Sequence, residues 1–467
     1  MHINKTLINI SIYLGLVCAL QCKAFAQLNK NSQVVGYPAP PGLETSKDFS
    51  ITVNNKSIWT ETVGNGGMEN LNVANFSAAG PQTITITAAA AIKKYEILPK
   101  SRNIIGHLNG RKLTFNISGP QKLYIEINSF PHLAIFSNPP EVQAPRQGDA
   151  GVVYYAASTS HSEREIDLQN DQTIYIEGGA VLNANIRGKN VHNIKIIGRG
   201  ILNGNVRISG TSNLEVNGIF IRNTAGWCNT LTDCKNTVYK NVKVFSYKTV
   251  WGIDGIDPVS CKNFIIDDCF IRTRDDCVSI KSMRNRGNDT TESINTDSIT
   301  VKNSVLMGWS HADGVTMGFE LQGGLVQNVL VKNCDILSAR GQGRTGGHSA
   351  FSIVCDGPSI VKNVRFEDIR VESAIEYKNL ELIVTEGRRY GTAGPGIING
   401  VYLKNIKWSN ADKPFVIAGI PTNFVENVTF DHCYLGGKLL KNTNDADFQT
   451  EFTRNIKFIT GKASAEK

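Results

Sequence analysis

A chain of 467 residues is too long for one ordinary core, so two domains or one elongated repeat array are expected. Aromatic residues make up 8% and charged residues 19%, a composition that suits a β-rich globular protein and excludes a disordered chain. The net charge of +8 comes from scattered basic residues without a nucleic-acid-binding motif, so it favours an anionic glycan over a nucleic acid as partner.

The first 26 residues have the features of a secretory signal peptide. Lys5 precedes an apolar stretch over residues 7–20, and an Ala-Phe-Ala cleavage site ends at Ala26. The apolar stretch is too short to span a membrane comfortably as an uncleaved anchor. Residues 1–26 are therefore predicted to be removed, which leaves a secreted or periplasmic protein with no membrane segment.

Residues 27–145 are predicted to form an antiparallel β-sandwich. Short stretches of alternating apolar and polar residues are separated by turns rich in glycine, proline and asparagine, at residues 49–53, 83–87, 112–117 and 122–127. A run of turn-forming residues over 138–148 follows, and it marks the boundary of this domain.

From residue 150 to 467 a different pattern recurs, in which an asparagine introduces a short strand of alternating valine, isoleucine and phenylalanine. Copies begin at Asn193, Asn213, Asn236, Asn263, Ser298, Asn328, Asn363, Asn427 and Asn455. The irregular period, with two short strands in each copy, predicts a right-handed parallel β-helix with loops of variable length. A β-propeller is the alternative, but it requires four strands in each unit and a more even period.

The ten cysteines of the chain fall to eight when the predicted signal peptide is removed. Cys269, Cys334 and Cys433 occupy the same place in the repeats, which favours buried thiols in a stacked interior. Cys228 and Cys234 are the pair best placed for a disulfide. Since no two CxxC motifs occur, no structural zinc is expected, and no cofactor is predicted.

A cluster of carboxylates lies within the repeats, in the segment WGIDGIDPVSCKNFIIDDCFIRTRDDCVSIKS over residues 251–282. Asp275 and Asp276 follow Asp254 by 21 and 22 residues, about one coil, so the three carboxylates are expected to meet on adjacent coils. Such a cluster can supply the acid and the base that glycosidic bond cleavage needs, because mutual repulsion raises the pKa of one carboxyl group. The alternative is that they are turn formers, as Asp267 and Asp268 are expected to be.

The segments GIDGID and RDDCVSIKS resemble the NTDGxD and DDCxAIKS motifs of glycoside hydrolase family 28, the polygalacturonases and their relatives in the pectate-lyase-like superfamily. The resemblance implies that Asp275 is the general acid, that Asp254 and Asp276 activate water, and that Asp257 supports them. It also implies a secreted hydrolase that cleaves the O-glycosidic bonds of a polysaccharide with inversion of configuration.

Two motifs of family 28 differ in this chain. Asp313, in the segment DGVTMG, stands where the family has the histidine of its Gly-His-Gly motif, and His311 lies two residues earlier. The family's Arg-x-Lys motif is not evident. A β-sandwich followed by a β-helix is also similar to the layout of glycoside hydrolase family 49, the dextranases and isopullulanases. This second resemblance also implies hydrolysis with inversion through the same three carboxylates.

Further polar and aromatic residues in the loops between repeats are candidates for binding the glycan. These candidates are Asp257, Lys281, His311, Asp313, His348, Arg389, Trp251 and Trp309.

Two other functions fit the pattern in part. A polysaccharide lyase on the same fold would use a lysine or arginine as base and often calcium, and would release an unsaturated product. A non-catalytic glycan-binding solenoid would account for the repeats, but not for an aspartate followed one coil later by an aspartate pair. The sequence indicates neither the sugar and linkage, nor endo or exo action, nor the oligomeric state.

Overall fold

The computed structural model describes residues 33–64, 70–222, 224–245, 252–283, 294–341, 347–387 and 390–461. The predicted signal peptide, Trp251 and Arg389 lie outside these ranges. In the described chain the regular elements are strands, apart from two short 3₁₀ turns, η1 (Lys100–Arg102) and η2 (Thr443–Asp445). Among the residues described, the structure contains no apolar helix of membrane-spanning length.

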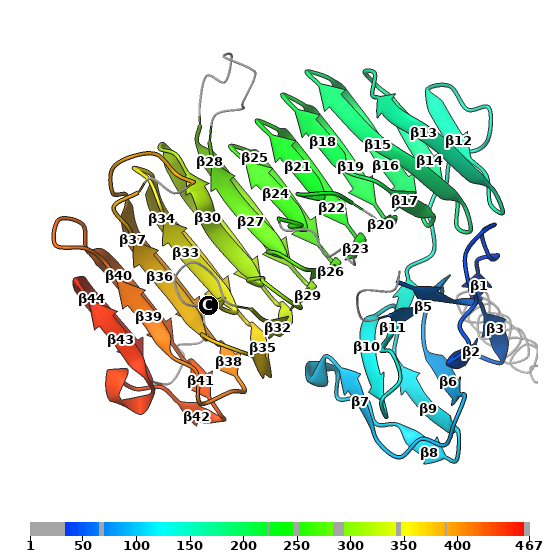
Figure 1. Ribbon diagram of the computed structural model, residues 1–467, viewed down its shortest axis with the longest axis horizontal. Coiled ribbons are helices and arrows are strands. Elements are labelled where there is room, and N and C mark those ends of the chain that lie inside the picture. Colours follow the sequence, from blue (N-terminus) through cyan, green and yellow to red (C-terminus); the bar gives the residue numbers. More distant parts are fainter. Residues whose placement is uncertain are drawn as a thin grey trace, which may run out of the picture.

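The amino-terminal part of the chain forms two sheets (Figure 1). The first sheet has the order β1 (Val35–Gly36), β5 (Leu71–Ser77), β11 (Leu133–Asn138), β10 (Lys122–Ile127) and β7 (Tyr95–Leu98), with β4 (Thr60–Val63) also paired to β5. The second has the order β3 (Lys56–Ile58), β2 (Phe49–Val53), β6 (Gln82–Ala88), β9 (Lys112–Ile117) and β8 (His107–Asn109). Alternate apolar side chains of both sheets, such as Ile51 and Ile84 from one and Phe76 and Ile125 from the other, meet in one core.

The first sheet is not purely antiparallel, and the prediction was wrong on this point. β4 and β5 form one antiparallel pair, and β10 and β11 form another, but β11 lies parallel to β5 where the two pairs meet. Alternation of apolar residues specifies which side of a strand is buried, but not the direction of its neighbour.

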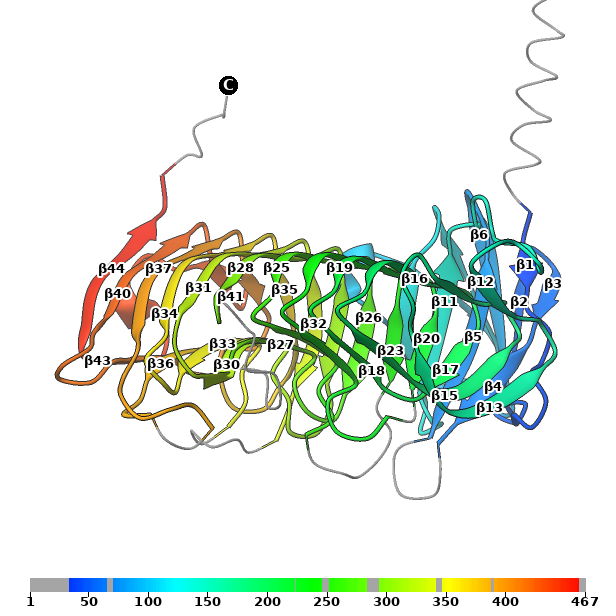
Figure 2. The same cartoon turned by 90° about the horizontal axis from the view of Figure 1, so that it is seen from above.

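The rest of the described chain coils into a parallel β-helix with three faces, each a ladder of strands (Figures 1 and 2). The first ladder contains twelve strands in parallel register: β12 (Val152–Tyr155), β14 (Thr173–Ile176), β16 (His192–Gly198), β19 (Ser212–Asn217), β22 (Lys235–Lys240), β25 (Lys262–Asp267), β28 (Thr296–Lys302), β31 (Leu325–Lys332), β34 (Ile360–Glu367), β37 (Ile397–Lys404), β40 (Val425–Asp431) and β44 (Thr453–Ile459).

Two long strands, β13 (Ser160–Asp167) and β15 (Val181–Lys189), begin the other two faces, which then separate into distinct ladders. The second ladder continues through β17 (Ile201–Asn203), β20 (Phe220–Arg222), β23 (Lys243–Phe245), β26 (Phe270–Thr273), β29 (Val305–Gly308), β32 (Asp335–Ala339), β35 (Arg370–Ile375), β38 (Lys407–Trp408) and β41 (Tyr434–Leu435), with β42 (Lys438–Leu439) turning back on β41. The third ladder comprises β18 (Val206–Ser209), β21 (Asn229–Thr232), β24 (Ile256–Val259), β27 (Val278–Ser282), β30 (Val315–Leu321), β33 (Phe351–Cys355), β36 (Leu380–Val384), β39 (Phe415–Ala418) and β43 (Phe448–Glu451).

The asparagines that introduce the repeats lie within the first four residues of first-ladder strands. Asn193, Asn213, Asn236 and Asn263 have φ between 54° and 58°, the left-handed region that asparagine tolerates better than most residues. Their side-chain amides also stack, since Asn213, Asn236 and Asn263 each donate to the asparagine of the preceding coil, Asn213 to Asn193 at 2.9 Å. The repeat therefore has a backbone cause and a side-chain cause, and the predicted right-handed parallel β-helix is confirmed.

The interior of the coils contains cysteine thiols that form no disulfide among the described residues. All eight cysteines of the described residues are free and buried, including Cys269, Cys334 and Cys433 as predicted. The predicted disulfide between Cys228 and Cys234 is wrong. These two residues lie at opposite ends of β21, whose four residues span about 13 Å, whereas a disulfide needs Cα atoms within about 7 Å.

The β-sandwich packs against the second ladder through aromatic rings and a buried ion pair. Phe136 of β11 meets Phe220, Phe245 and Phe270 of three successive coils, with ring centroids 5.1 to 5.9 Å apart. Beside them the guanidinium of Arg222 donates two hydrogen bonds to the carboxylate of Glu61, at 2.8 and 3.0 Å. The sandwich thus covers the second ladder at β20, β23 and β26.

Candidate active site

The predicted carboxylates lie on the turns that connect the second ladder to the third. Backbone hydrogen bonds stack these turns: Gly255 N donates to Asp276 O at 2.8 Å, and Cys277 N donates to Asp313 O at 3.0 Å. Asp254, Asp276 and Asp313 consequently stand at equivalent places on three successive coils. The spacing of one coil between Asp254 and Asp276 that was expected from the sequence is present. The row of aspartates continues one coil further, to Asp313.

Asp275 precedes Asp276 and is the most accessible carboxylate of the group. Its side chain is half-buried, whereas Asp254 and Asp276 are buried. One oxygen accepts a hydrogen bond from Gly252 N, and the other accepts one from Asp276 N, both at 3.1 Å. The backbone of two neighbouring coils thus fixes this carboxyl group while leaving part of it open to a ligand.

Lys281 of β27 lies among three carboxylates rather than at the surface. Its Nζ atom is 2.6 Å from Glu320, 3.4 Å from Asp254 and 3.9 Å from Asp257, and its side chain is 3% exposed. Burial lowers the pKa of Lys281, but these carboxylates raise it further, so the net shift is upward and the ammonium stays charged. Lys281 is thus a buried counter-ion of Asp254. It can influence a bound sugar only through that carboxylate.

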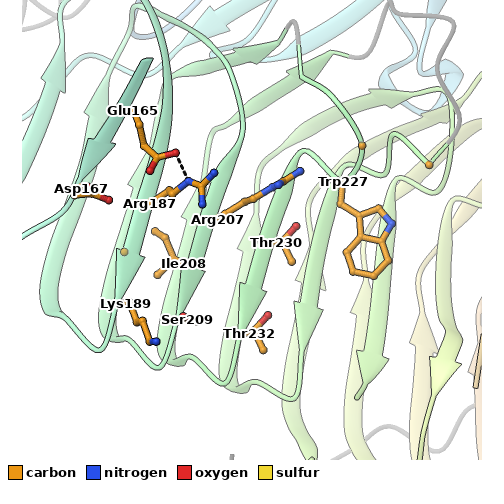
Figure 3. Close-up of a pocket in the computed structure, with 13 residues that line it drawn as sticks. Glu165, Asp167, Arg187, Lys189, Arg207, Ile208, Ser209, Trp227, Thr230 and Thr232 are labelled. Atoms are coloured by element: carbon orange, nitrogen blue, oxygen red, sulfur yellow. Dashed lines mark ion pairs between the residues drawn. The ribbon is translucent and has the colours of Figure 1, made fainter. Parts of the chain in front are cut away.

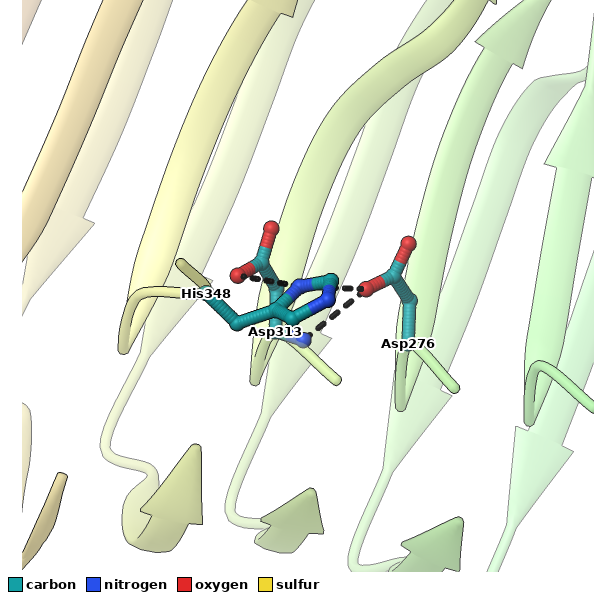
Figure 4. Close-up of side chains that lie close together, drawn as sticks. All are labelled: Asp276, Asp313 and His348. Atoms are coloured by element: carbon teal, nitrogen blue, oxygen red, sulfur yellow. Dashed lines mark hydrogen bonds and ion pairs between the residues drawn. The ribbon is translucent and has the colours of Figure 1, made fainter. Parts of the chain in front are cut away.

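An imidazole reaches the row of aspartates from the following coil (Figure 4). His348, on the turn before β33, has its Nδ1 atom 3.3 Å from Asp313 and 3.9 Å from Asp276. The Asp313 carboxylate also accepts hydrogen bonds from Ser349 N at 2.6 Å and from the Ser352 hydroxyl at 2.7 Å. The position where family 28 motifs have a histidine thus holds an aspartate, and the imidazole comes from one coil later.

Burial and mutual repulsion raise the pKa values of the central carboxyl groups. Burial raises the pKa of Asp254 to about 7, with Lys281 opposing the shift and Asp275 adding to it. Burial, together with the nearby Asp313 and Asp275 carboxylates, holds the pKa of Asp276 well above its ordinary value. Burial also raises the pKa of Asp275, against the lowering effect of His348 and Lys281. All three carboxyl groups therefore hold their protons to a higher pH than an isolated aspartate does.

Asp313 and His348 form a charge-balanced pair at the edge of this group. Although burial alone would raise the pKa of Asp313, His348 and the hydrogen bonds from Ser349 and Ser352 lower it overall. Burial alone would lower the pKa of His348, but Asp313 raises it overall. The pair is accordingly ionised on both sides and places a positive charge beside Asp276 and Asp275.

The other predicted residues have different surroundings. His311 lies beside the site. Its ring centroid is 6.5 Å from that of His348, and its Nδ1 atom is 2.9 Å from the Ser310 hydroxyl. Trp309 packs under the guanidinium of Arg272 at 5.4 Å, which is a packing role. Trp251 and Arg389 lie outside the described residues, so the structure does not place them.

One aromatic residue of the site was not predicted. Trp227 precedes β21, and the Lys281 Nζ atom lies 4.1 Å from the centre of its ring. The register of the coils places it one coil before Asp254, since Cys228 N donates to Asp254 O at 2.9 Å. Nothing in its local sequence repeats a family motif, so only the stacking of coils brings it to the carboxylates.

Asp276, Asp313 and His348 have ligand atoms within 4.8 Å of one another, a spacing that a metal ion could use. The oxygen atoms of both aspartates, however, already accept hydrogen bonds within the protein. Asp276 Oδ1 accepts one from Asp313 N at 2.8 Å, and the Asp313 carboxylate accepts one from each of two serines. The arrangement fits a hydrogen-bonded carboxylate and imidazole cluster, whose chemistry is proton transfer.

Comparisons with known proteins give the family and the fold of this chain. The family model described as glycosyl hydrolases family 28 matches residues 139–412, more than half of the chain. A search of curated proteins finds no match. Dex49A from Penicillium minioluteum has a similar structure, with a TM-score of 0.55, 11% identity, and coverage of 90% of this chain and 96% of that one.

Two bacterial enzymes are also similar in structure. A hyperthermoactive exopolygalacturonase from Thermotoga maritima gives a TM-score of 0.51 and 17% identity, covering 66% of this chain and 83% of that one. A family 28 exopolygalacturonase from Yersinia enterocolitica gives 0.50 and 12%, covering 90% and 99%. At these identities the likeness establishes the β-helix fold, while the family match identifies the motifs within it. This chain belongs to the glycosyl hydrolases of family 28, and it hydrolyses glycosidic bonds.

Proposed function

We propose that this protein is an exported hydrolase that cleaves a polysaccharide with inversion of configuration, through Asp254, Asp275 and Asp276. The observation that carries the proposal is the half-buried Asp275 beside two buried aspartates stacked on successive coils. An inverting glycosidase needs one carboxylic acid for the leaving oxygen and a carboxylate on the other side that holds and deprotonates water.

Accessibility decides between the roles in this proposal. Asp275 is the carboxyl group that a bound glycan can reach, so it donates the proton to the leaving oxygen. Asp254 and Asp276 lie in one buried row, where a single water can be held between adjacent coils. Lys281 favours the ionised form of Asp254, because its charge opposes the burial that raises the pKa of this carboxyl group.

The test is hydrolysis itself. The purified chain is incubated with neutral, uronic and sulfated glycans, and both reducing ends and ultraviolet absorption of the products are measured. New reducing ends without unsaturated product are expected. An unsaturated product would make the protein a lyase, and binding without product from any glycan would make it a glycan-binding solenoid.

His348 sets the pH range of the proposed acid. Its positive charge lowers the pKa of Asp275, so the variant His348→Gln should have Asp275 with a higher pKa. Because the acid must be protonated to act, the alkaline limb of kcat/KM against pH is expected to move to higher pH. The matched control is His192→Gln, which removes an exposed histidine of the first ladder. An alkaline limb that stays in place or moves to lower pH would contradict this role.

A further inference from the structure

The ammonium group of Lys281 has an aromatic neighbour on an earlier coil and a carboxylate neighbour on the following coil. The Trp227 ring, shown in Figure 3, is centred 4.1 Å from Nζ. Glu320, near the end of β30, accepts a hydrogen bond from Nζ at 2.6 Å, the shortest ion pair that Lys281 makes among the described residues. The residue that fixes Glu320 therefore also bears on Asp254, which lies 3.4 Å from the same ammonium.

The backbone of Glu320 has a conformation that is uncommon for a residue with a side chain. Its φ is 61°, in the left-handed region. The N–H groups of Glu320 and Leu321 both point at one carboxylate, that of Asp356, at 3.3 and 3.0 Å. Successive N–H groups that converge in this way form a concavity that binds an anion, and here a side chain of the next coil occupies it.

Asp356 joins three successive coils. It directly follows β33, is 3% exposed, and accepts a third hydrogen bond from Gly391 N at 2.7 Å, in the segment between β36 and β37. A Cβ atom at Gly391 would lie 2.0 Å from the Asp356 carbonyl oxygen, so this close approach requires glycine. In the described part of the chain the partners of the Asp356 carboxylate are these backbone donors, and no ion pair joins it to Lys281.

We propose that Asp356 is a positioning residue of the active site, which fixes the backbone of Glu320 so that the Glu320 carboxylate shares the Lys281 ammonium with Asp254. Asp356 acts through Glu320 and not by a contact of its own with the reacting groups. The inference rests on the proposed function, since it takes Asp254 as part of the base that activates water.

The charges around Asp254 give the direction of the expected effect. They come from its own coil and the next two coils, and they are those of Asp257, Asp275, Asp276, Lys281 and Glu320. Burial raises the pKa of Asp254, the Lys281 charge lowers it, and the Glu320 carboxylate raises it. Removing Glu320 from Lys281 should therefore lower the pKa of Asp254. Because a base must be ionised to act, the acidic limb of kcat/KM should move to lower pH.

The test is a double-mutant cycle of Glu320→Gln and Asp356→Asn, in which kcat/KM is measured against pH on the glycan that the wild-type protein cleaves. The asparagine keeps only one of the two oxygens that receive the three N–H groups. Each single variant should move the acidic limb to lower pH, Glu320→Gln by about one pH unit. The double variant should move it no further than Glu320→Gln alone, because both changes act through one carboxylate.

The control is Asp431→Asn, at a 7% exposed position on β40 of the first ladder, where the carboxylate accepts a hydrogen bond from Tyr402. It should leave the acidic limb in place even if it lowers the thermal unfolding midpoint. Shifts of Asp356→Asn and Glu320→Gln that add up, or an acidic limb that Asp356→Asn does not move, would overturn the proposal. If Asp356→Asn does not fold, Asp356→Ser leaves room for water at the three N–H groups; failure of both to fold would make Asp356 a structural residue.

Crystal structures of the wild-type protein and of Asp356→Asn separate this proposal from the proposed function. Loss of the contact between Lys281 and Glu320 in the variant is expected, and an intact contact would overturn the positioning role. If the wild-type protein cleaves no glycan, the proposed function fails, and the presence or absence of this contact still decides the role of Asp356.

Discussion

Asp275→Asn is expected to lower kcat by a factor on the order of 100 to 10,000, because the amide keeps the shape of the carboxyl group but cannot donate its proton. The amide oxygen can still accept one of the two backbone hydrogen bonds, from Gly252 N or from Asp276 N, and the side chain is half-buried, so the fold should be retained. The measurement is the rate of release of reducing ends from the glycan that the wild-type protein cleaves, together with the thermal unfolding midpoint of both proteins.

The control for this variant is Asp412→Asn, which makes the same change at an exposed loop position. It should leave both the rate and the unfolding midpoint unchanged. Near-normal activity of Asp275→Asn would show that another group donates the proton. Loss of activity accompanied by loss of folding would instead make Asp275 a structural residue.

Lys281→Met is expected to affect both stability and pH dependence. The substitution leaves the buried Asp254 and Asp257 and the half-buried Glu320 without their shared cation, and breaking a buried ion pair costs about 3 to 5 kcal/mol of folding free energy. Asp254 and Asp257 then keep folded-state pKa values above their unfolded values, so stability is retained at low pH and lost as pH rises through the folded values. Denaturant unfolding at acidic and neutral pH measures this difference.

The same variant should shift the activity profile. Lys281 holds the pKa of Asp254 down to about 7 against the effect of burial, so its removal raises that pKa further. A base must be ionised to act, and the acidic limb of kcat/KM should therefore move to higher pH. Lys195→Met, at an exposed first-ladder position, is the control and should change neither property. An acidic limb that moves to lower pH, or a variant as stable as the wild type at neutral pH, would contradict the role of Lys281.

The β-helix was predictable because its repeat has a local physical cause. Asparagines such as Asn193 and Asn213 must adopt a left-handed conformation and form an amide ladder, so each coil repeats them. The spacing from Asp254 to Asp276 was equally informative, since one coil separates them without a long insertion. Where coil length is regular, distance in sequence translates directly into distance in space.

The remaining parts of the site depend on loops of irregular length or on contacts between distant segments. His348 follows Asp313 by 35 residues, so the sequence could not show that this imidazole reaches the preceding aspartates. Trp227 reaches the site only through the lateral register of the third ladder. The parallel pairing of β11 with β5 likewise follows from chain direction rather than local pattern, whereas Cys228 and Cys234 are kept apart by the extended strand β21 between them.

The stereochemistry of the first product tests the central claim most directly. Hydrolysis of a defined oligosaccharide is followed by proton magnetic resonance from the first minutes, before the anomers of the product equilibrate. If Asp275 protonates the leaving oxygen while Asp254 and Asp276 direct water to the opposite side, the product appears first with the anomeric configuration inverted relative to the cleaved bond. A product that appears first with retained configuration would require a covalent intermediate and would contradict the account.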